Sequence, residues 1–117
     1  MSVHPHALDV ARLSRGKLRL IGLGGIGSFL APVVVRFVAS LESVPATIHL
    51  VDGDEFEAHN AVRMQVPDYG NKAAVLADEL LGEHRRPGLT LRGIEQFIDA
   101  DNAARWIEEG DIVLLAV

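Results

Sequence analysis

The chain has 117 residues, of which 49% are hydrophobic and 23% charged, as expected for one globular domain with a buried core. Its net charge of -5 argues against non-specific binding to nucleic acid, and the absence of cysteine excludes disulfides, a cysteine zinc site and a cysteine nucleophile from this segment. No apolar run approaches the roughly 20 residues that a membrane span needs, and the N-terminus has no signal-peptide core. We therefore expect a cytoplasmic protein without a membrane or nucleic-acid partner.

The first predicted elements are a short apolar strand over residues 17–23, a glycine turn and a long helix. Pro32 lies inside the helix and should kink it or weaken one turn. The large apolar residues of the helix recur at helical spacing as one continuous stripe: Ile26, Phe29, Leu30, Val33, Val34, Phe37, Val38 and Leu41. The face opposite this stripe carries small residues, a pattern that lets a helix be covered on both sides.

The remaining segments alternate between strand and helix. Strands are predicted over residues 47–51, 89–93 and 111–117, and a second helix over 71–81. This alternation predicts an α/β fold, a Rossmann-like, doubly wound and mainly parallel sheet with helices on both faces. We expect residues 1–16 to be an N-terminal extension and 17–117 a nucleotide-binding domain. Because the sequence stops within its fourth strand, we expect a truncated fold from a longer protein.

Helix ends are predicted from their capping residues. Asn71 should cap the second helix and Gly82 should end it. A third helix should be capped by Asp99 or Asp101 and stopped by Gly110. Two basic segments, 12–19 and 84–86, are interpreted as solvated faces or helix ends.

Four glycines after the first strand give the strongest functional signal: Gly22, Gly24, Gly25 and Gly27. A strand, a glycine turn and a helix together let backbone N–H groups close on a phosphate at the helix N-terminus. The pattern alone is weak, because a tight and closely packed turn explains it as well. Asp52, at the end of the second strand, strengthens the signal, since a carboxylate there can accept hydrogen bonds from a ribose. The alternative for Asp52 is an ordinary turn residue before Gly53.

A long polar stretch follows Asp52. Residues 53–70 show no clear period and contain acidic, basic and amide side chains, and Lys72 begins the next helix. Long polar loops at the carboxyl edge of a sheet are frequent functional positions. His49, by contrast, lies within a strand, where a packed or hydrogen-bonded role is favoured over a catalytic one.

Four segments together resemble the ThiF-type family, the adenylating enzymes related to ubiquitin-activating enzymes. They are the doubled glycine in residues 22–28, the Asp-x-Asp of Asp52 and Asp54, the Asn-x-x-Arg of Asn60 and Arg63, and the Lys-Ala that begins at Lys72. Their order and approximate spacing match the family from Leu18 to the last strand. Two details depart from its pattern: Met64 follows Arg63, with Gln65 one residue later, and the gap between Gly70 and Lys72 is one residue short.

The resemblance implies a site and an activity. The glycine turn, Gly25 above all, would lie against the phosphates of ATP, Asp52 would bind the ribose, and Asp54 would belong to the same site. Asn60, Arg63 and Lys72 would reach the phosphates, with Arg63 and Lys72 as the catalytic cations. The family uses ATP and Mg²⁺ to adenylate the C-terminal carboxylate of a small ubiquitin-like or sulfur-carrier-like protein, commonly as a homodimer. Its metal-binding aspartate would lie beyond Val117.

Two other functions stay open. An NAD(P)-dependent oxidoreductase or another dinucleotide-binding domain would use the same turn and Asp52, but it leaves Asn60, Arg63 and Lys72 unexplained. A non-catalytic relative would use the fold only to bind a partner. Arg63 could also be a surface residue paired with Glu55 or Glu57, and Lys72 an ordinary residue of the first helical turn.

Overall fold

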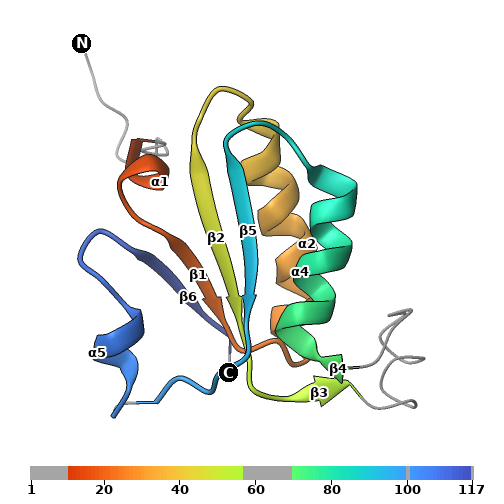
Figure 1. Cartoon of the computed structure of the whole chain (residues 1–117), viewed down its shortest axis with the longest axis vertical. Coiled ribbons are helices and arrows are strands. Elements are labelled where there is room, and N and C mark those ends of the chain that lie inside the picture. Colours follow the sequence, from red (N-terminus) through yellow and green to blue (C-terminus); the bar gives the residue numbers. More distant parts are fainter. Residues whose placement is uncertain (1–10, 57–69, 100, 117) are drawn as a thin grey trace.

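The computed structural model describes residues 11–56, 70–99 and 101–116. Four parallel strands form the main sheet in the order β5-β2-β1-β6, namely β1 (Leu18–Ile21), β2 (Ala46–Val51), β5 (Leu89–Ile94) and β6 (Ile112–Leu115). The helices are α1 (Ala11–Arg15), α2 (Gly25–Ser40), α4 (Lys72–His84) and α5 (Ala103–Trp106). Two short strands, β3 (Glu55–Phe56) and β4 (Gly70–Asn71), pair antiparallel outside the main sheet (Figure 1). The described chain is therefore the predicted Rossmann-like α/β fold.

The order of the strands creates a switch point in the sheet. From β1 the chain moves in one direction to β2 and β5, and it then returns to place β6 on the other side of β1. The strands that neighbour β1 on its two sides, β2 and β6, therefore belong to chain segments on opposite sides of this point. In open α/β sheets, ligands bind in the crevice that forms at such a point.

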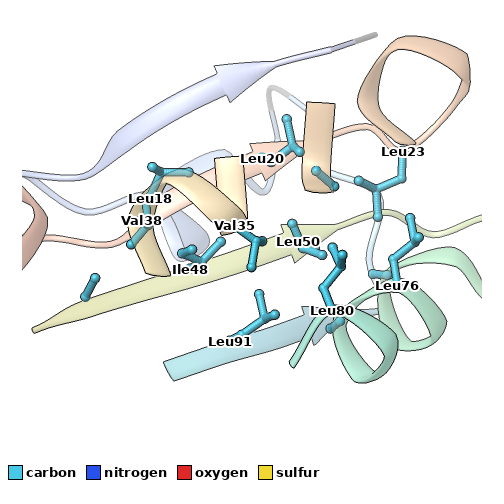
Figure 2. Close-up of a cluster of buried hydrophobic side chains, with 14 of the residues drawn as sticks. Leu18, Leu20, Leu23, Val35, Val38, Ile48, Leu50, Leu76, Leu80 and Leu91 are labelled. Carbon is cyan, nitrogen blue, oxygen red and sulfur yellow. The ribbon is translucent and has the colours of Figure 1, made fainter. Parts of the chain in front are cut away.

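Helices cover both faces of the sheet, as predicted, but unequally. On one face α2 and α4 pack over the strands, and the core contains completely buried leucine and isoleucine side chains from β1 and β2, Leu20, Ile48 and Leu50 (Figure 2). On the other face a smaller cluster contains Ile21, Val51 and Ile94, with Ile98, Trp106 and Ile107 packed against it. In the described part of the chain, no helix is long and apolar enough to cross a membrane.

The long helix α2 lies on the sheet through its small face. Its buried residues are Gly27, Ala31, Val35 and Val38. Small residues let the helix axis approach the strands, so the covered face is not the one with the heaviest side chains. In the described chain, four members of the predicted apolar stripe are instead exposed: Ile26, Phe29, Val33 and Phe37.

Two predicted helix ends are wrong. The helix α4 does not stop at Gly82 but continues to His84. Gly82 is exposed and does not adopt the positive φ that glycine often has at the end of a helix. The backbone instead becomes extended at Arg85, shortly before Pro87. The third helix, α5, has only four residues and leaves helical conformation at Ile107 instead of reaching Gly110.

Of the two predicted N-terminal caps, only the one at Asn71 is confirmed. Asn71 precedes α4, and its side chain accepts a hydrogen bond from the N–H group of Ala74, which is the usual role of a cap. The prediction of Asp99 or Asp101 as the cap of α5 is wrong, because Asn102 is the N-cap and makes no capping hydrogen bond with its side chain. Asp99 instead accepts from the N–H groups of Asp101 and Asn102, in the turn before α5.

Candidate functional site

A cavity of about 350 Å³ lies at the carboxyl edge of the main sheet. Segments that follow all four parallel strands contribute to its wall: the glycine turn after β1, Asp52 and Asp54 after β2, residues 96–98 after β5, and Ala116 after β6. The switch point between β1 and β6 is therefore part of this cavity. Its volume falls in the range of small-molecule sites.

The four glycines of the turn divide into two pairs. Gly22 has a φ of +94°, which disfavours other residues, and a Cβ on Gly27 would overlap the carbonyl group of Gly22. These two glycines shape the turn and let α2 pack closely on it. In contrast, a Cβ on Gly24 or Gly25 would meet nothing within 4 Å, and both residues line the cavity. The second pair therefore leaves open the space that a ligand needs.

Asp52 ties the glycine turn to the end of β2. Its side chain is buried, with the residue 8% exposed, and one carboxylate oxygen accepts from the N–H group of Leu23. The other oxygen accepts from the N–H group of Asp54 at 2.8 Å. Each carboxylate oxygen has a second lone pair, so Asp52 can still accept a hydroxyl group from a ligand in the cavity. The carboxylate thus has both a structural role and free accepting capacity.

Lys72 is held next to the cavity by Asp54. Its Nζ lies 3.9 Å from Oδ2 of Asp54, and its backbone N–H donates to the carbonyl oxygen of Asp54 at 2.9 Å. The lysine side chain is 16% exposed and the aspartate side chain 59%, and only Asp54 lines the cavity. An ion pair with an exposed carboxylate contributes little stability. Its main effect is to place a cation directly behind the wall of the site.

Sequence reasoning missed the part of the site that follows β5. Gln96, Phe97 and Ile98 line the cavity, and the ring of Phe97 lies so close to Gly53 that a Cβ there would overlap it. Phe97 is nevertheless 62% exposed. Large apolar residues directly after a strand of a parallel sheet were the available signal, because this edge is where ligands bind. Asn60 and Arg63 lie outside the described residues.

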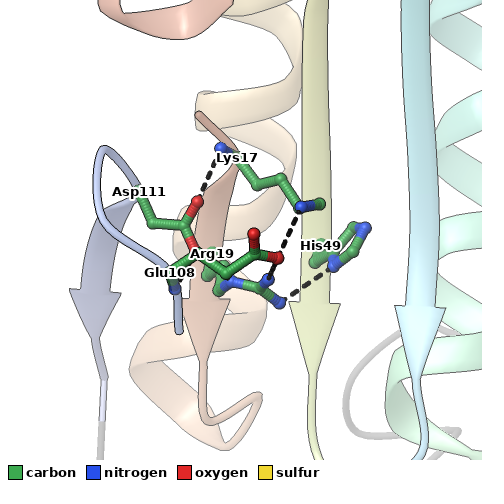
Figure 3. Close-up of polar contacts among 5 residues, drawn as sticks. All are labelled: Lys17, Arg19, His49, Glu108 and Asp111. Atoms are coloured by element: carbon green, nitrogen blue, oxygen red, sulfur yellow. Dashed lines mark hydrogen bonds and ion pairs between the residues drawn. The ribbon is translucent and has the colours of Figure 1, made fainter. Parts of the chain in front are cut away.

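A buried polar cluster lies on the second face of the sheet (Figure 3). Arg19 is only 3% exposed, so the prediction of a solvated basic face is wrong for this residue. Its Nε donates to Asp111 at 2.7 Å and its Nη1 to Nδ1 of His49 at 3.1 Å. A guanidinium has no acceptor, so Nδ1 of His49 must be unprotonated. The expectation that His49 is packed and hydrogen-bonded is confirmed.

The pKa values of this cluster follow from its surroundings. Burial lowers the pKa of His49 to about 4, and the positive charges of Arg19, Lys17 and Arg92 act in the same direction. Burial alone would raise the pKa of Asp111, but hydrogen bonds from the N–H group of Glu108, the Arg19 guanidinium and the N–H group of Lys17 outweigh it and lower that pKa to about 2. At neutral pH the cluster therefore contains a neutral imidazole and an ionised carboxylate.

The second basic segment is a helix end, as interpreted. Arg86 donates to the carbonyl oxygens of Val38 and Ala39, in the last turn of α2, and of Val44, in the loop that follows. It lies at the opposite end of α2 from the glycine turn. Among the described residues, no group of three or more His, Asp or Glu side chains could hold a metal ion.

Comparison with known proteins agrees with this fold. The sequence matches the ThiF family over residues 4–117. It is 32% identical over 110 residues to the ATP-dependent ubiquitin transferase-like protein Cap2 of Vibrio cholerae. The matched region covers 91% of this chain and 18% of Cap2.

Two solved E. coli structures have a similar fold. The tRNA N6-threonylcarbamoyladenosine dehydratase TcdA matches with a TM-score of 0.66 and 21% identity, over 92% of this chain and 44% of TcdA. MccB matches with a TM-score of 0.59 and 27% identity, over 91% of this chain and 29% of MccB. The chain thus spans less than half the length of Cap2, TcdA or MccB. With the family matched from residue 4 to residue 117, the chain belongs to the ThiF family.

Proposed function

We propose that this chain is the ATP-binding portion of an adenylating enzyme, which activates a carboxylate as an acyl-adenylate and releases pyrophosphate. The observation that carries the proposal is the cavity at the switch point, where open glycines adjoin a buried carboxylate and a lysine at the start of α4. Membership of the ThiF family supports the reaction class.

The proposed placement of ATP follows from the chemistry of the cavity wall. The phosphates lie against Gly24 and Gly25, because the first N–H groups of α2 have no acceptor within the helix and a helix N-terminus attracts anions. The ribose hydroxyls donate to Asp52. The adenine base lies toward Phe97 and Ile98, which offer apolar surface.

The catalytic part of the proposal concerns two cations that stabilise the charge of the reaction. Attack of a carboxylate oxygen on the α-phosphorus brings two anions together and leaves charge on the departing pyrophosphate. Lys72 and Arg63 are proposed to stabilise that charge, and Asn60 to donate a hydrogen bond to the phosphates. In this scheme Lys72 exchanges the carboxylate of Asp54 for a phosphate oxygen. Mg²⁺ would arrive with the triphosphate, next to Asp54, and its further protein ligand would lie beyond Val117.

The proposed substrate is the C-terminal carboxylate of a small ubiquitin-like or sulfur-carrier-like protein. The name of Cap2 refers to ubiquitin transfer, and structures of MccB have been solved with ATP and with MccA. The name of Cap2 supports an acceptor of the ubiquitin-like kind, and the MccB structures support a site that takes ATP and a second molecule. The complete protein is proposed to act in the cytoplasm as a homodimer.

Calorimetry with ATP–Mg²⁺ and, separately, with NAD tests the choice of nucleotide. We expect binding of ATP–Mg²⁺, weakened roughly tenfold or more by Lys72→Ala and less by Lys72→Arg, which keeps the charge. NAD binding without any response to ATP would instead identify a dinucleotide-binding domain.

Pyrophosphate exchange by the complete protein with its carboxyl-terminal partner tests the reaction. We expect exchange in the parent and a large loss in Lys72→Ala. A parent that binds ATP but shows no exchange would be a non-catalytic relative, and an unchanged rate in Lys72→Ala would remove the role given to Lys72.

A further inference from the structure

Asn71 makes three hydrogen bonds with one buried amide group. Its Nδ2 donates to the carbonyl oxygens of Asp52, at 2.9 Å, and Asp54, at 3.2 Å. Its Oδ1 accepts from the N–H group of Ala74 at 3.0 Å, and the residue is 8% exposed. The donors and acceptors fix the orientation of the amide, because carbonyl oxygens can only accept and an N–H group can only donate.

These bonds join the Asp52–Asp54 segment, which contributes to the cavity wall, to the start of α4. Asp52 holds the glycine turn through the N–H group of Leu23, and Asp54 pairs with Lys72 through both its carboxylate and its carbonyl oxygen. Asn71 holds the backbone of both aspartates while it caps the helix that begins at Lys72. A continuous set of hydrogen bonds therefore runs from the glycine turn to Lys72, with Asn71 in its middle.

A helix cap alone does not require asparagine. Serine, threonine and aspartate cap helices about as well. None of them, however, has an amide that can donate to two carbonyl oxygens at once. Aspartate would also place a third carboxylate next to Asp52 and Asp54, where like charges repel.

We propose that Asn71 is a positioning residue of the nucleotide site, which sets the Asp52–Asp54 segment and Lys72 at a fixed distance from the glycine turn. The inference rests on the proposed function, because the segment and the lysine are the groups that would meet ribose and phosphate. Asn71 itself does not line the cavity, so it acts through its three partners.

Two substitutions separate positioning from capping. Asn71→Ser keeps a neutral cap and removes both amide donors, whereas Asn71→Ala removes the cap as well. We expect both variants to bind ATP–Mg²⁺ at least about tenfold more weakly than the parent, the range expected when a supporting contact of a site is lost. Only Asn71→Ala should also lose a marked part of its thermal stability.

Arg86→Ala is the matched control. It removes a side chain that also holds several backbone carbonyl oxygens, but at the far end of α2. It should lower the melting temperature and leave the affinity for ATP–Mg²⁺ unchanged. If Asn71→Ser binds ATP–Mg²⁺ as the parent does, Asn71 is only a cap and the proposal is overturned.

An NMR measurement keeps the proposal testable if the parent does not bind ATP. In the parent, the side-chain amide protons of Asn71 should exchange with solvent far more slowly than those of the exposed Gln96. In Asn71→Ser, the backbone amide resonances of Leu23, Asp54 and Lys72 should shift together. If the parent shows these signatures but does not bind ATP, the proposed function is wrong, while the positioning of Lys72 by Asn71 stands. If the side-chain amide protons of Asn71 exchange fast, the positioning itself is wrong.

Discussion

Arg19, His49 and Asp111 show how a buried charge can be accommodated on a parallel sheet. The guanidinium of Arg19 is paired closely with the carboxylate of Asp111, lies 4.0 Å from that of Glu108 and donates to the neutral imidazole of His49. No buried side-chain nitrogen or oxygen among the described residues lacks a partner. Removing one member of such a pair is costly, because it leaves the other charge buried without compensation. The cluster links β1, β2 and the start of β6 on the face that α2 and α4 do not cover.

This cluster predicts a specific loss of stability in mild acid. The pKa of His49 is lowered from 6.5 to about 4 in the folded chain, so between these values the unfolded chain binds more protons. Stability from His49 is thus fully present above pH 6.5 and is lost as the pH falls toward 4. The expected loss between pH 7 and pH 5 is about 2 kcal/mol.

Urea unfolding at both pH values measures this loss, and His49→Asn is the comparison, because its amide oxygen can accept from Arg19 without titrating. The parent should lose about 2 kcal/mol more than the variant over this interval. Asp111 does not interfere, because its pKa is lowered to about 2 and its contribution persists until the pH falls below 3.8. Equal losses in the parent and His49→Asn would show that His49 is not buried as described.

At the scale of single residues, the sequence predicted those positions that depend on local order. The glycine turn after β1, the place of Asp52 at the end of β2 and the cap at Asn71 all follow from neighbours a few positions away. The burial of Arg19 could not be predicted, because its carboxylate partner is 92 positions away. The two hydrogen bonds that Asn71 donates to the carbonyl oxygens of Asp52 and Asp54 could not be predicted either, because these partners are also distant in the sequence.

At the scale of elements, α2 shows why periodicity alone does not identify a buried face. Both sides of this helix are apolar, and the residues that pack on the sheet are the smaller ones. Which face is covered depends on how closely the helix approaches the strands, and Gly27 sets that approach at one end. Periodicity predicts the helix and its length but leaves its rotation about its own axis undetermined.

Two valines on α2 allow a matched test of this orientation. Val35 is fully buried and Val33 is 47% exposed, so the same change to alanine removes the same atoms from different surroundings. Val35→Ala should cost about 2 kcal/mol, and Val33→Ala no more than about 0.5 kcal/mol. The gain in helix propensity is the same for both and cancels in the comparison.

Chemical denaturation of the two variants at neutral pH provides the measurement. A cost for Val33→Ala as large as that for Val35→Ala would show that the exposed stripe is packed against another surface in solution. A small cost for both would show instead that α2 does not rest on the sheet through Val35.

At the scale of the whole molecule, the order of the strands decides where the chemistry can occur. Residues from four separate segments meet at one edge because the four strands are parallel, and the switch point lies at β1 because β6 is on the other side of it from β2 and β5. Alternation of strands and helices predicted this class of fold, and therefore the edge at which the glycine turn and Asp52 meet. It could not predict that residues 96–98 complete the wall, because the path after β5 depends on packing against Gly53.

The glycine turn allows a test of ligand binding through the stability of the whole fold. A ligand that binds only the folded chain stabilises it, by about 1.4 kcal/mol at ten times its dissociation constant. ATP–Mg²⁺ at that concentration should therefore raise the melting temperature by several degrees. Gly25→Val should abolish the rise without lowering the melting temperature of the free chain, because its side chain enters only the open space of the cavity.

Gly27→Ala should have the opposite effect: it should lower the melting temperature of the free chain and keep the rise with ATP–Mg²⁺, because its Cβ overlaps the carbonyl group of Gly22. The free variant should melt at a lower temperature than the parent, since the turn must shift to accept the methyl group. Scanning fluorimetry of the parent and both variants, with and without ATP–Mg²⁺, separates the two effects. If Gly25→Val keeps the full rise, the nucleotide does not lie against the glycine turn, and the proposed placement of its phosphates is wrong.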